Sequence, residues 1–263
     1  MEIVALLSFV VIGVLAGLIG GLLGLSGGIV TVPCLVLLFR LMGIPQTYLM
    51  HIAIGTSLAA MVLNSLASMW AHHRRQGVVW KIVFAMIPGI FLGCMLGSFV
   101  AQFLSSVVLQ VVFGSFICFL GAYILLQKRK RQEKKLPDKT LYTWLGFGIG
   151  TLSSLLGVGG GVFSVPLLIS YRYPEKQAVG TSAAMGLFIT FVAAVAYLYF
   201  GLKEVKLPLT LGFIYLPAFA VIGFVAIFFA PLGAKLAHRI KGALLRKIFA
   251  GTLIIVGILM IFN

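Results

Sequence analysis

The sequence predicts an all-α polytopic membrane protein, made of two inverted repeats with about five helical segments each and eight to ten spans in total. Composition is the first observation: 61% of the 263 residues are hydrophobic and 10% are charged, against about 45–50% and about 25% in soluble domains. The second is that the apolar runs are continuous and about 20 residues long, unlike the alternating strands of a membrane β-barrel. The third is a glycine-rich motif that occurs twice.

The repeated motifs occur in the same order in both halves of the chain. "LLGLSGGIVTVP" at 22–33 matches "LLGVGGGVFSVP" at 155–166, and "AIGTSLAAM" at 53–61 matches "AVGTSAAM" at 178–185. A third, weaker match follows later in each half. Three ordered matches indicate an internal duplication.

This duplication divides the chain into three parts. We expect a first transmembrane repeat over 1–126, a cytoplasmic basic linker over 127–140 and a second transmembrane repeat over 141–263. The linker is rich in Lys and Arg and is typical of a solvated segment. No basic residues precede the first apolar run, so we expect this run to stay in the fold instead of being removed as a signal peptide.

Each half contains five apolar segments, and the second of each is short. Fourteen helical residues cover about 21 Å, less than the roughly 30 Å of a bilayer core. Glycine breaks are therefore expected beside both short segments. The segments are expected at 3–24, 29–42, 48–70, 80–101 and 108–127, then at 141–157, 162–172, 178–201, 209–230 and 247–262.

The positions of the basic residues indicate whether the short segments cross. If all ten segments cross with the linker inside, 17 of the 20 Lys and Arg residues fall inside, and only Arg40, Lys203 and Lys206 fall outside. If the short segments do not cross, the division is 12 to 8. The positive-inside rule favours ten crossings. Five crossings per half invert the second repeat and place both termini outside, an architecture that recurs in secondary transporters.

The glycine-rich motifs predict helix breaks at membrane depth. The pairs Gly27-Gly28 and Gly160-Gly161 discourage regular helix, and Pro33 and Pro166 favour the start of a new helix nearby. Backbone that is not helical is tolerated there only if it is buried or lines a cavity. Helix N-termini bind anions, so two of them could meet in one anion site. Glycines four residues apart also form packing faces, which is the expectation for the glycines at 89, 93 and 97.

Hydroxyl side chains form the second set of candidates. The Gly-Thr-Ser stretches offer hydroxyls that can donate to an oxyanion without carrying charge, although they can also bond to helix carbonyls or neighbouring helices. Asn64 is a weaker candidate, since Ile189 occupies the matching position. The predicted substrate-binding residues are Gly27, Gly28, Thr31, Thr56, Ser57, Gly160, Gly161, Ser164, Thr181 and Ser182.

The acidic residues argue against a cation as substrate. Proton and cation transporters usually keep carboxylates inside the membrane, but here all five acids fall at the terminus or in expected loops. The three cysteines show no metal-ligand spacing, and no cofactor is predicted. The basic residues lie between apolar runs, which indicates contact with lipid headgroups instead of nucleic acid. The acids are Glu2, Glu133, Asp138, Glu175 and Glu204.

The motifs resemble those of the TauE/SafE sulfite-exporter family, also called TSUP or DUF81. "GLLGLSGGIVTVP", "LLGVGGGVFSVP" and the two "GTS" stretches carry the resemblance, which covers nearly the whole chain. It implies a bacterial or archaeal inner-membrane transporter, with about eight spans where the charge count favours ten. Members are linked to sulfite, thiosulfate, sulfoacetate or other organic anions, so the motif does not identify the substrate.

These observations predict a secondary transporter, in the direction of export, for a small anion such as sulfite, another sulfur oxyanion or an organosulfonate. The two repeats would rock around a midplane site to alternate access. A passive anion channel is the alternative. An integral-membrane enzyme is a further one, but no acid pair, Ser-His-Asp set or metal-spaced His cluster can be assembled for it. The expected partners are the anion and the lipid bilayer.

Overall fold

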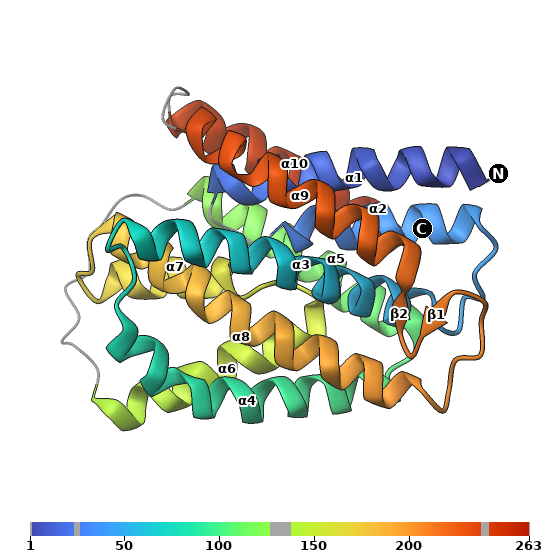
Figure 1. Cartoon of the computed structure of the whole chain (residues 1–263), viewed down its shortest axis with the longest axis horizontal. Coiled ribbons are helices and arrows are strands. Elements are labelled where there is room, and N and C mark those ends of the chain that lie inside the picture. The colour runs from blue at the N-terminus through green and yellow to red at the C-terminus, as the bar shows by residue number, and fades with distance from the viewer. Residues whose placement is uncertain (1, 24–26, 127–137, 238–241, 263) are drawn as a thin grey trace.

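The computed structural model of the protein describes residues 2–23, 27–126, 138–237 and 242–262. Most of the described residues are helical, and Figure 1 shows the helices lying roughly along one common axis. The described elements are α1 (Glu2–Leu23), α2 (Gly28–Leu41), α3 (Leu49–Arg74), α4 (Trp80–Phe103), α5 (Ser106–Leu126), α6 (Lys139–Leu156), α7 (Gly161–Ser170), α8 (Glu175–Gly201), β1 (Thr210–Leu211), β2 (Ile214–Tyr215), α9 (Leu216–Ala237) and α10 (Gly242–Phe262).

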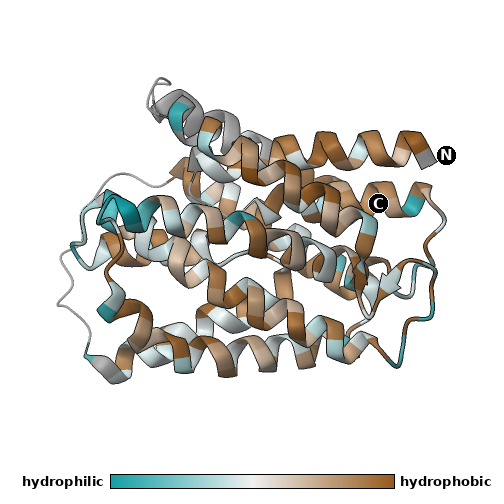
Figure 2. Ribbon diagram, in the orientation of Figure 1, coloured by the Kyte–Doolittle hydropathy of each residue, from teal (hydrophilic) through white to brown (hydrophobic). Residues whose placement is uncertain are grey.

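Six of the described helices are long and apolar enough to cross a membrane, which confirms the predicted all-α polytopic class. They are α1, α3, α4, α5, α8 and α9. The helices α2 and α7 are apolar but shorter, with 14 and 10 residues. In Figure 2 hydrophobic residues cover the lengths of the helices, and hydrophilic residues gather at their ends and in the connections.

Helices at the same place in the two halves run in opposite directions. In Figure 1 the N- and C-terminal ends lie on the same side, α1 starts from that side, and its counterpart α6 starts from the other. The helices α2 and α7 likewise end on opposite sides. Successive segments therefore alternate in direction, as the ten-segment arrangement requires.

The packing has the same two-fold pattern. The helix α1 packs on α9 as α6 packs on α4, α2 packs on α3 as α7 packs on α8, and α3 packs on α9 as α8 packs on α4. The pairs α3 with α8 and α5 with α10 join equivalent helices directly. Exchanging the two halves therefore reproduces this set of helix pairs, as expected of a duplicated and inverted repeat.

The glycine line of α4 is a packing face, as the spacing predicted. A Cβ atom added at Gly89 would collide with the carbonyl oxygen of Thr143 on α6, and one at Gly93 with that of Phe147. The Thr143 hydroxyl also donates to the Ala85 carbonyl at 3.0 Å. Small residues let two membrane helices approach until their backbones touch, which explains why α4 and α6 form an extensive helix pair.

The expected segment at 209–230 is wrong at its start. Residues 210–215 form a β-hairpin in which Thr210 pairs with Tyr215, and the helix α9 begins only at Leu216. Gly212 in the two-residue turn has φ +58°, a conformation that glycine adopts readily and that suits such hairpins. The apolar composition of this stretch hid the turn.

The described basic residues lie at the two ends of the bundle. Arg74, Arg75 and Lys81 flank the connection from α3 to α4, whereas Lys203 lies in the connection from α8 to β1 at the opposite end. The described acids lie at helix ends or in a loop, where Asp138 caps α6 by accepting from the Leu141 N–H at 2.8 Å. Glu133 and most of the linker lie outside the described residues.

Candidate functional site

The two glycine-rich motifs start the short helices α2 and α7. Gly27 and Gly160 are the residues before these helices, with φ of +80° and +73°. This left-handed conformation favours glycine, and it turns the chain before the helices begin at Gly28 and Gly161. Neither helix start has a side-chain cap. The predicted breaks are therefore present, and both helix N-termini are inside the bundle, where Gly28 and Gly161 are buried.

The prolines do not mark the helix starts, so that expectation is wrong. Pro33 and Pro166 lie inside α2 and α7, five residues after the first helical residue. The left-handed glycines Gly27 and Gly160, and not the prolines, determine where the two short helices begin. Proline lacks an N–H, so the carbonyls of Ile29 and Val162 receive no helical hydrogen bond from it. Both short helices thus carry a point of weakened backbone pairing one turn after they start.

The two motifs touch each other across the repeat boundary. A Cβ atom added at Gly28 would lie 2.6 Å from the carbonyl oxygen of Gly157, at the end of α6. Gly157 has φ +67°, and its own Cβ position is 3.0 Å from the Val32 side chain. The Ser57 hydroxyl on α3 donates to the same Gly157 carbonyl at 3.4 Å. The structure therefore brings Gly28, Ser57 and the second motif together.

The hydroxyls inside the motifs bond to their own helix starts. The Thr31 hydroxyl donates to the Gly27 carbonyl at 3.1 Å, and the Ser164 hydroxyl donates to the Gly160 carbonyl at 2.9 Å. Both side chains are buried. Ser164 also lies 2.6 Å from Ser182 on α8, so the second repeat has a pair of adjoining hydroxyls beside α7.

The two threonines of the Gly-Thr-Ser stretches do not lie together. Thr56 accepts a hydrogen bond from the Tyr215 N–H at 2.9 Å, and Thr181 accepts one from the Val79 N–H at 2.9 Å. Tyr215 and Val79 each precede a helix of the other repeat, α9 and α4, and these helix starts lie at opposite ends of the bundle in Figure 1. Each threonine thus joins one repeat to the other.

The glycines of these stretches make that contact possible. A Cβ atom at Gly55 would collide with the Phe213 carbonyl oxygen, and one at Gly180 with the Gly77 carbonyl oxygen. Glycine and threonine therefore act as one unit, which we call the threonine clamp: Gly55-Thr56 at one end and Gly180-Thr181 at the other. Their part in substrate binding stays a prediction, whereas their contact with the opposite repeat is a structural fact.

His51 in α3 is also fixed by contacts with neighbouring elements. Its Nε2 lies 3.0 Å from the Ala101 carbonyl oxygen, its Nδ1 lies 3.4 Å from the Ser106 hydroxyl, and its ring stacks on Phe213 at 5.1 Å between centroids. This histidine thus packs under the hairpin, and its contacts are with backbone, a hydroxyl and a ring.

Sequence reasoning gave no role to Ser153 on α6. Its hydroxyl is buried and has no hydrogen-bond partner in the described parts of the chain. It lies 3.4 Å from the position of a Cβ atom on Gly160. An unpaired buried hydroxyl is costly, so Ser153 offers a free donor beside the start of α7. The sequence offered one weak indication of this position: Ser153 lies four residues before Gly157 of the glycine-rich motif.

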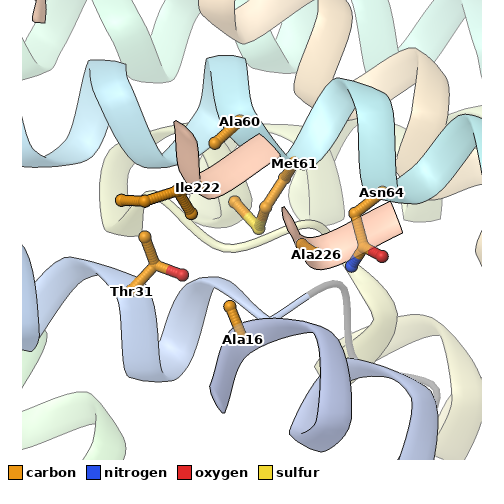
Figure 3. A pocket seen from close by; sticks show the side chains of 7 residues that line it. All are labelled: Ala16, Thr31, Ala60, Met61, Asn64, Ile222 and Ala226. Carbon is orange, nitrogen blue, oxygen red and sulfur yellow. The ribbon is translucent and has the colours of Figure 1, made fainter. Parts of the chain in front are cut away.

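A cavity lies beside the start of α2, between α1, α2, α3 and α9. Figure 3 shows Thr31 and Asn64 on two sides of it, with Met61 between them. The space in it that a water-sized sphere can enter is about 10 Å³, which is room for about one water molecule. Asn64 was a weak candidate from sequence, because it has no polar counterpart. The small residues Ala16, Ala60 and Ala226 and the side chain of Ile222 complete the lining.

Comparisons with known proteins agree with this architecture. The family model described as sulfite exporter TauE/SafE matches residues 9–260. A "Probable membrane transporter protein" of Haemophilus influenzae is 34% identical, with 94% of each chain covered. One from Methanocaldococcus jannaschii is 28% identical over 96% of this chain and 94% of its own. YunE of Bacillus subtilis, with the same description, is 30% identical over 70% and 74%.

No solved structure is significantly similar to the chain. The family match nonetheless covers both glycine-rich breaks and both threonine clamps, together with all of the helices α2 to α9. The multi-pass helical architecture and the named relatives agree on a membrane transporter. The chain therefore belongs to the TauE/SafE sulfite exporter family.

Proposed function

We propose that the protein is a secondary transporter that exports a small anion, such as sulfite or another sulfur oxyanion, by alternating access. One observation carries the proposal: two short helices, one from each inverted repeat, begin at left-handed glycines inside the bundle, where the motifs touch. A helix N-terminus carries about half a positive charge and exposes N–H donors. The start of α2 meets the second motif at Gly157, four residues before α7 begins, and in this proposal both helix starts contribute to one anion site.

The neutral polar groups around the breaks support an anion over a cation. Ser57, Ser164 and Ser182 are buried hydroxyls within this region, and none of them carries charge. In the described residues the acids lie only at helix ends and in a loop, so no carboxylate there could coordinate a cation within a span. Proton and cation transporters usually keep such a group within the membrane.

Alternating access has a physical basis in the joints between the repeats. Each threonine clamp holds the other repeat at one end of the bundle. Opening one end while the other stays closed would expose the glycine breaks to one side at a time. A passive channel would need both ends open together.

The inner membrane of a bacterium or archaeon is the proposed location, with the lipid bilayer as the surrounding partner. Seventeen of the 20 Lys and Arg residues fall on one side of the ten-segment arrangement. The positive-inside rule assigns that side, with the linker 127–140, to the cytoplasm. Both termini would then face outward.

Substitution at the contact between the motifs tests the site. Gly28→Ala places a methyl group 2.6 Å from the Gly157 carbonyl, which must push the two breaks apart. We expect sulfite efflux from vesicles containing the purified protein to fall at least tenfold. The matched control is Gly148→Ala on α6, where an added Cβ meets nothing within 4 Å, and its efflux should equal that of the wild type.

Unchanged efflux in a folded Gly28→Ala protein would contradict the proposed site. Flux that rises linearly with concentration and never saturates would instead indicate a channel. Ser57→Ala offers a milder test, because it removes only the hydroxyl that bonds the Gly157 carbonyl. It should reduce efflux severalfold while the melting temperature changes little.

A further inference from the structure

The end of the bundle where α3 leads into α4 carries a surface of aromatic and basic side chains. The Arg74 guanidinium lies over the Trp70 ring, with 4.9 Å between its central carbon and the ring centroid. The Trp80 indole N–H donates to Nδ1 of His73 at 3.1 Å, and the Trp80 ring stacks on Phe84 at 5.7 Å between centroids. We call this set the basic-aromatic surface: Trp70, His73, Arg74, Trp80, Lys81 and Phe84.

The basic-aromatic surface is open to its surroundings. Trp70 is 57% exposed and Phe84 is 62% exposed, and the side chains of Arg74 and Lys81 are exposed as well. The stretch 66–84 holds three Lys or Arg residues and contains no Asp or Glu. Its positive charge is therefore not balanced by an acid of the same stretch.

The second repeat has none of these side chains at the equivalent helix start. Val79 and Tyr215 correspond to each other, because each donates its backbone N–H to a clamp threonine of the other repeat. The residues that follow them are Trp80-Lys81 in α4 and Leu216-Pro217 in α9. One helix start thus carries an indole and a charge where the other carries neither.

The ends of α3 and α8 differ in the same way. The offset that links the two Gly-Thr-Ser stretches also links His72 to Tyr197, whose carbonyls accept equivalent hydrogen bonds from the N–H groups of Gly77 and Phe213. At this offset the counterparts of Trp70, His73 and Arg74 are Val195, Leu198 and Tyr199. The two repeats share their helix pairs, so helix packing does not explain the tryptophans and charges of the basic-aromatic surface.

We propose that the basic-aromatic surface is a binding site for one anionic phospholipid of the surrounding bilayer. Tryptophan rings favour the headgroup level of a membrane, and basic residues beside a spanning helix attract anionic lipids. Phe84 lies one turn further along α4 than Trp80, on the side of the acyl chains. The proposal goes beyond the proposed function, because lipid binding does not depend on which solute is transported.

The polar groups of the site select a negatively charged headgroup. Because Nδ1 of His73 accepts from Trp80, its ring proton lies on Nε2 and can be donated. A guanidinium that lies flat on an indole keeps N–H donors along its edge, and Lys81 adds an ammonium group. A phosphodiester can accept from all three. A zwitterionic lipid would bring its own cation close to Arg74 and Lys81, whereas a glycerol headgroup has no such repulsion.

The bound lipid bridges two helices across a connection that belongs to a threonine clamp. Residues 75–79 join α3 to α4, and Gln76 has φ +55°, a conformation that is uncommon for residues other than glycine. At the end of this connection the Val79 N–H donates to Thr181. A headgroup held by side chains of both helices stabilises the connection, and with it the clamp that closes this end of the bundle.

The first test measures lipid selectivity at the site in the full chain. In a Trp144→Phe protein the two remaining tryptophans, Trp70 and Trp80, belong to the site. We reconstitute it in vesicles of equal parts phosphatidylglycerol and phosphatidylcholine, with bromine near the headgroup on the acyl chains of one lipid. Quenching of tryptophan fluorescence should give phosphatidylglycerol a binding constant about threefold or more above that of phosphatidylcholine.

A matched pair of charge variants separates this site from general attraction to a basic protein. Arg74→Gln with Lys81→Gln should make the two lipids bind equally. The control is Lys203→Gln with Lys206→Gln, which removes the same charge from exposed positions at the opposite end and should keep the preference. Equal quenching by both lipids in the unaltered site overturns the proposal. So does a preference that survives Arg74→Gln with Lys81→Gln, or one that is lost equally in the control.

The second test follows the threonine clamp. Phosphatidylglycerol added to the detergent-purified protein should raise its melting temperature by several degrees more than phosphatidylcholine does. Thr181→Val should keep the lipid preference in quenching but lose at least half of this rise, because the clamp is then broken. A full rise in Thr181→Val would overturn the link between lipid and clamp. Neither measurement involves transport, so a protein that moves no sulfite would contradict the proposed function and leave these results unaffected.

Discussion

At the scale of single residues, each threonine clamp joins a short sequence motif to backbone that is far away in the sequence. Thr181 and Val79 are 102 residues apart, and Thr56 and Tyr215 are 159 apart. The sequence could show that the Gly-Thr-Ser motif occurs twice, because that is a local pattern. It could not show which backbone each hydroxyl meets, since the partner is fixed only when the two repeats pack.

Removing one clamp oxygen should destabilise the protein. Thr181→Val has nearly the same shape but leaves the Val79 N–H without its acceptor, and an unsatisfied buried donor costs about 1–3 kcal/mol. We expect the melting temperature of the detergent-purified protein to fall by several degrees. Thr181→Ser keeps the oxygen and is the control, with most of the wild-type melting temperature. Equal melting of all three proteins would mean that the clamp adds no stability.

At the scale of elements, most helices could be predicted because apolar length alone defines a membrane span. The helix starts at Gly28 and Gly161 could be placed only to within a few residues, because glycine and proline each indicate a helix start at a different position. In the structure the helices begin directly after the left-handed glycines. The hairpin at 210–215 could not be predicted, because its residues are as apolar as the helix that follows.

The helix pair α4 with α6 gives a prediction at this scale. Gly93→Leu should prevent the close approach of the two backbones, because even a Cβ atom there collides with the Phe147 carbonyl. We expect little folded protein in size-exclusion chromatography of the detergent extract. The same substitution at Gly148, which faces open space on α6, should leave the elution profile unchanged. A monodisperse, wild-type-like Gly93→Leu protein would show that the glycine line is dispensable.

At the scale of the whole molecule, the internal duplication allowed the architecture to be predicted from the sequence. It did not reveal how the two repeats differ from each other. The same helix pairs recur when the halves are exchanged, and ordered motifs were sufficient to predict this. The two repeats differ in a few buried side chains, such as Asn64 against Ile189. The sequence shows that the two side chains differ, but only the three-dimensional packing shows that Asn64 lines a cavity whereas Ile189 packs on Gly160.

The orientation of the whole molecule follows from its charge distribution and can be measured directly. Arg75 and Lys203 are both exposed and lie at opposite ends of the bundle. In a protein whose Cys34, Cys94 and Cys118 are replaced by alanine, we introduce Arg75→Cys or Lys203→Cys and add a maleimide that cannot cross membranes to intact cells. The positive-inside rule places the many basic residues of the Arg75 end in the cytoplasm. Lys203→Cys should therefore react at once, and Arg75→Cys only after the membrane is permeabilised. The reverse pattern would invert the topology, and reaction of both in intact cells would exclude the alternation of segments on which the transport proposal depends.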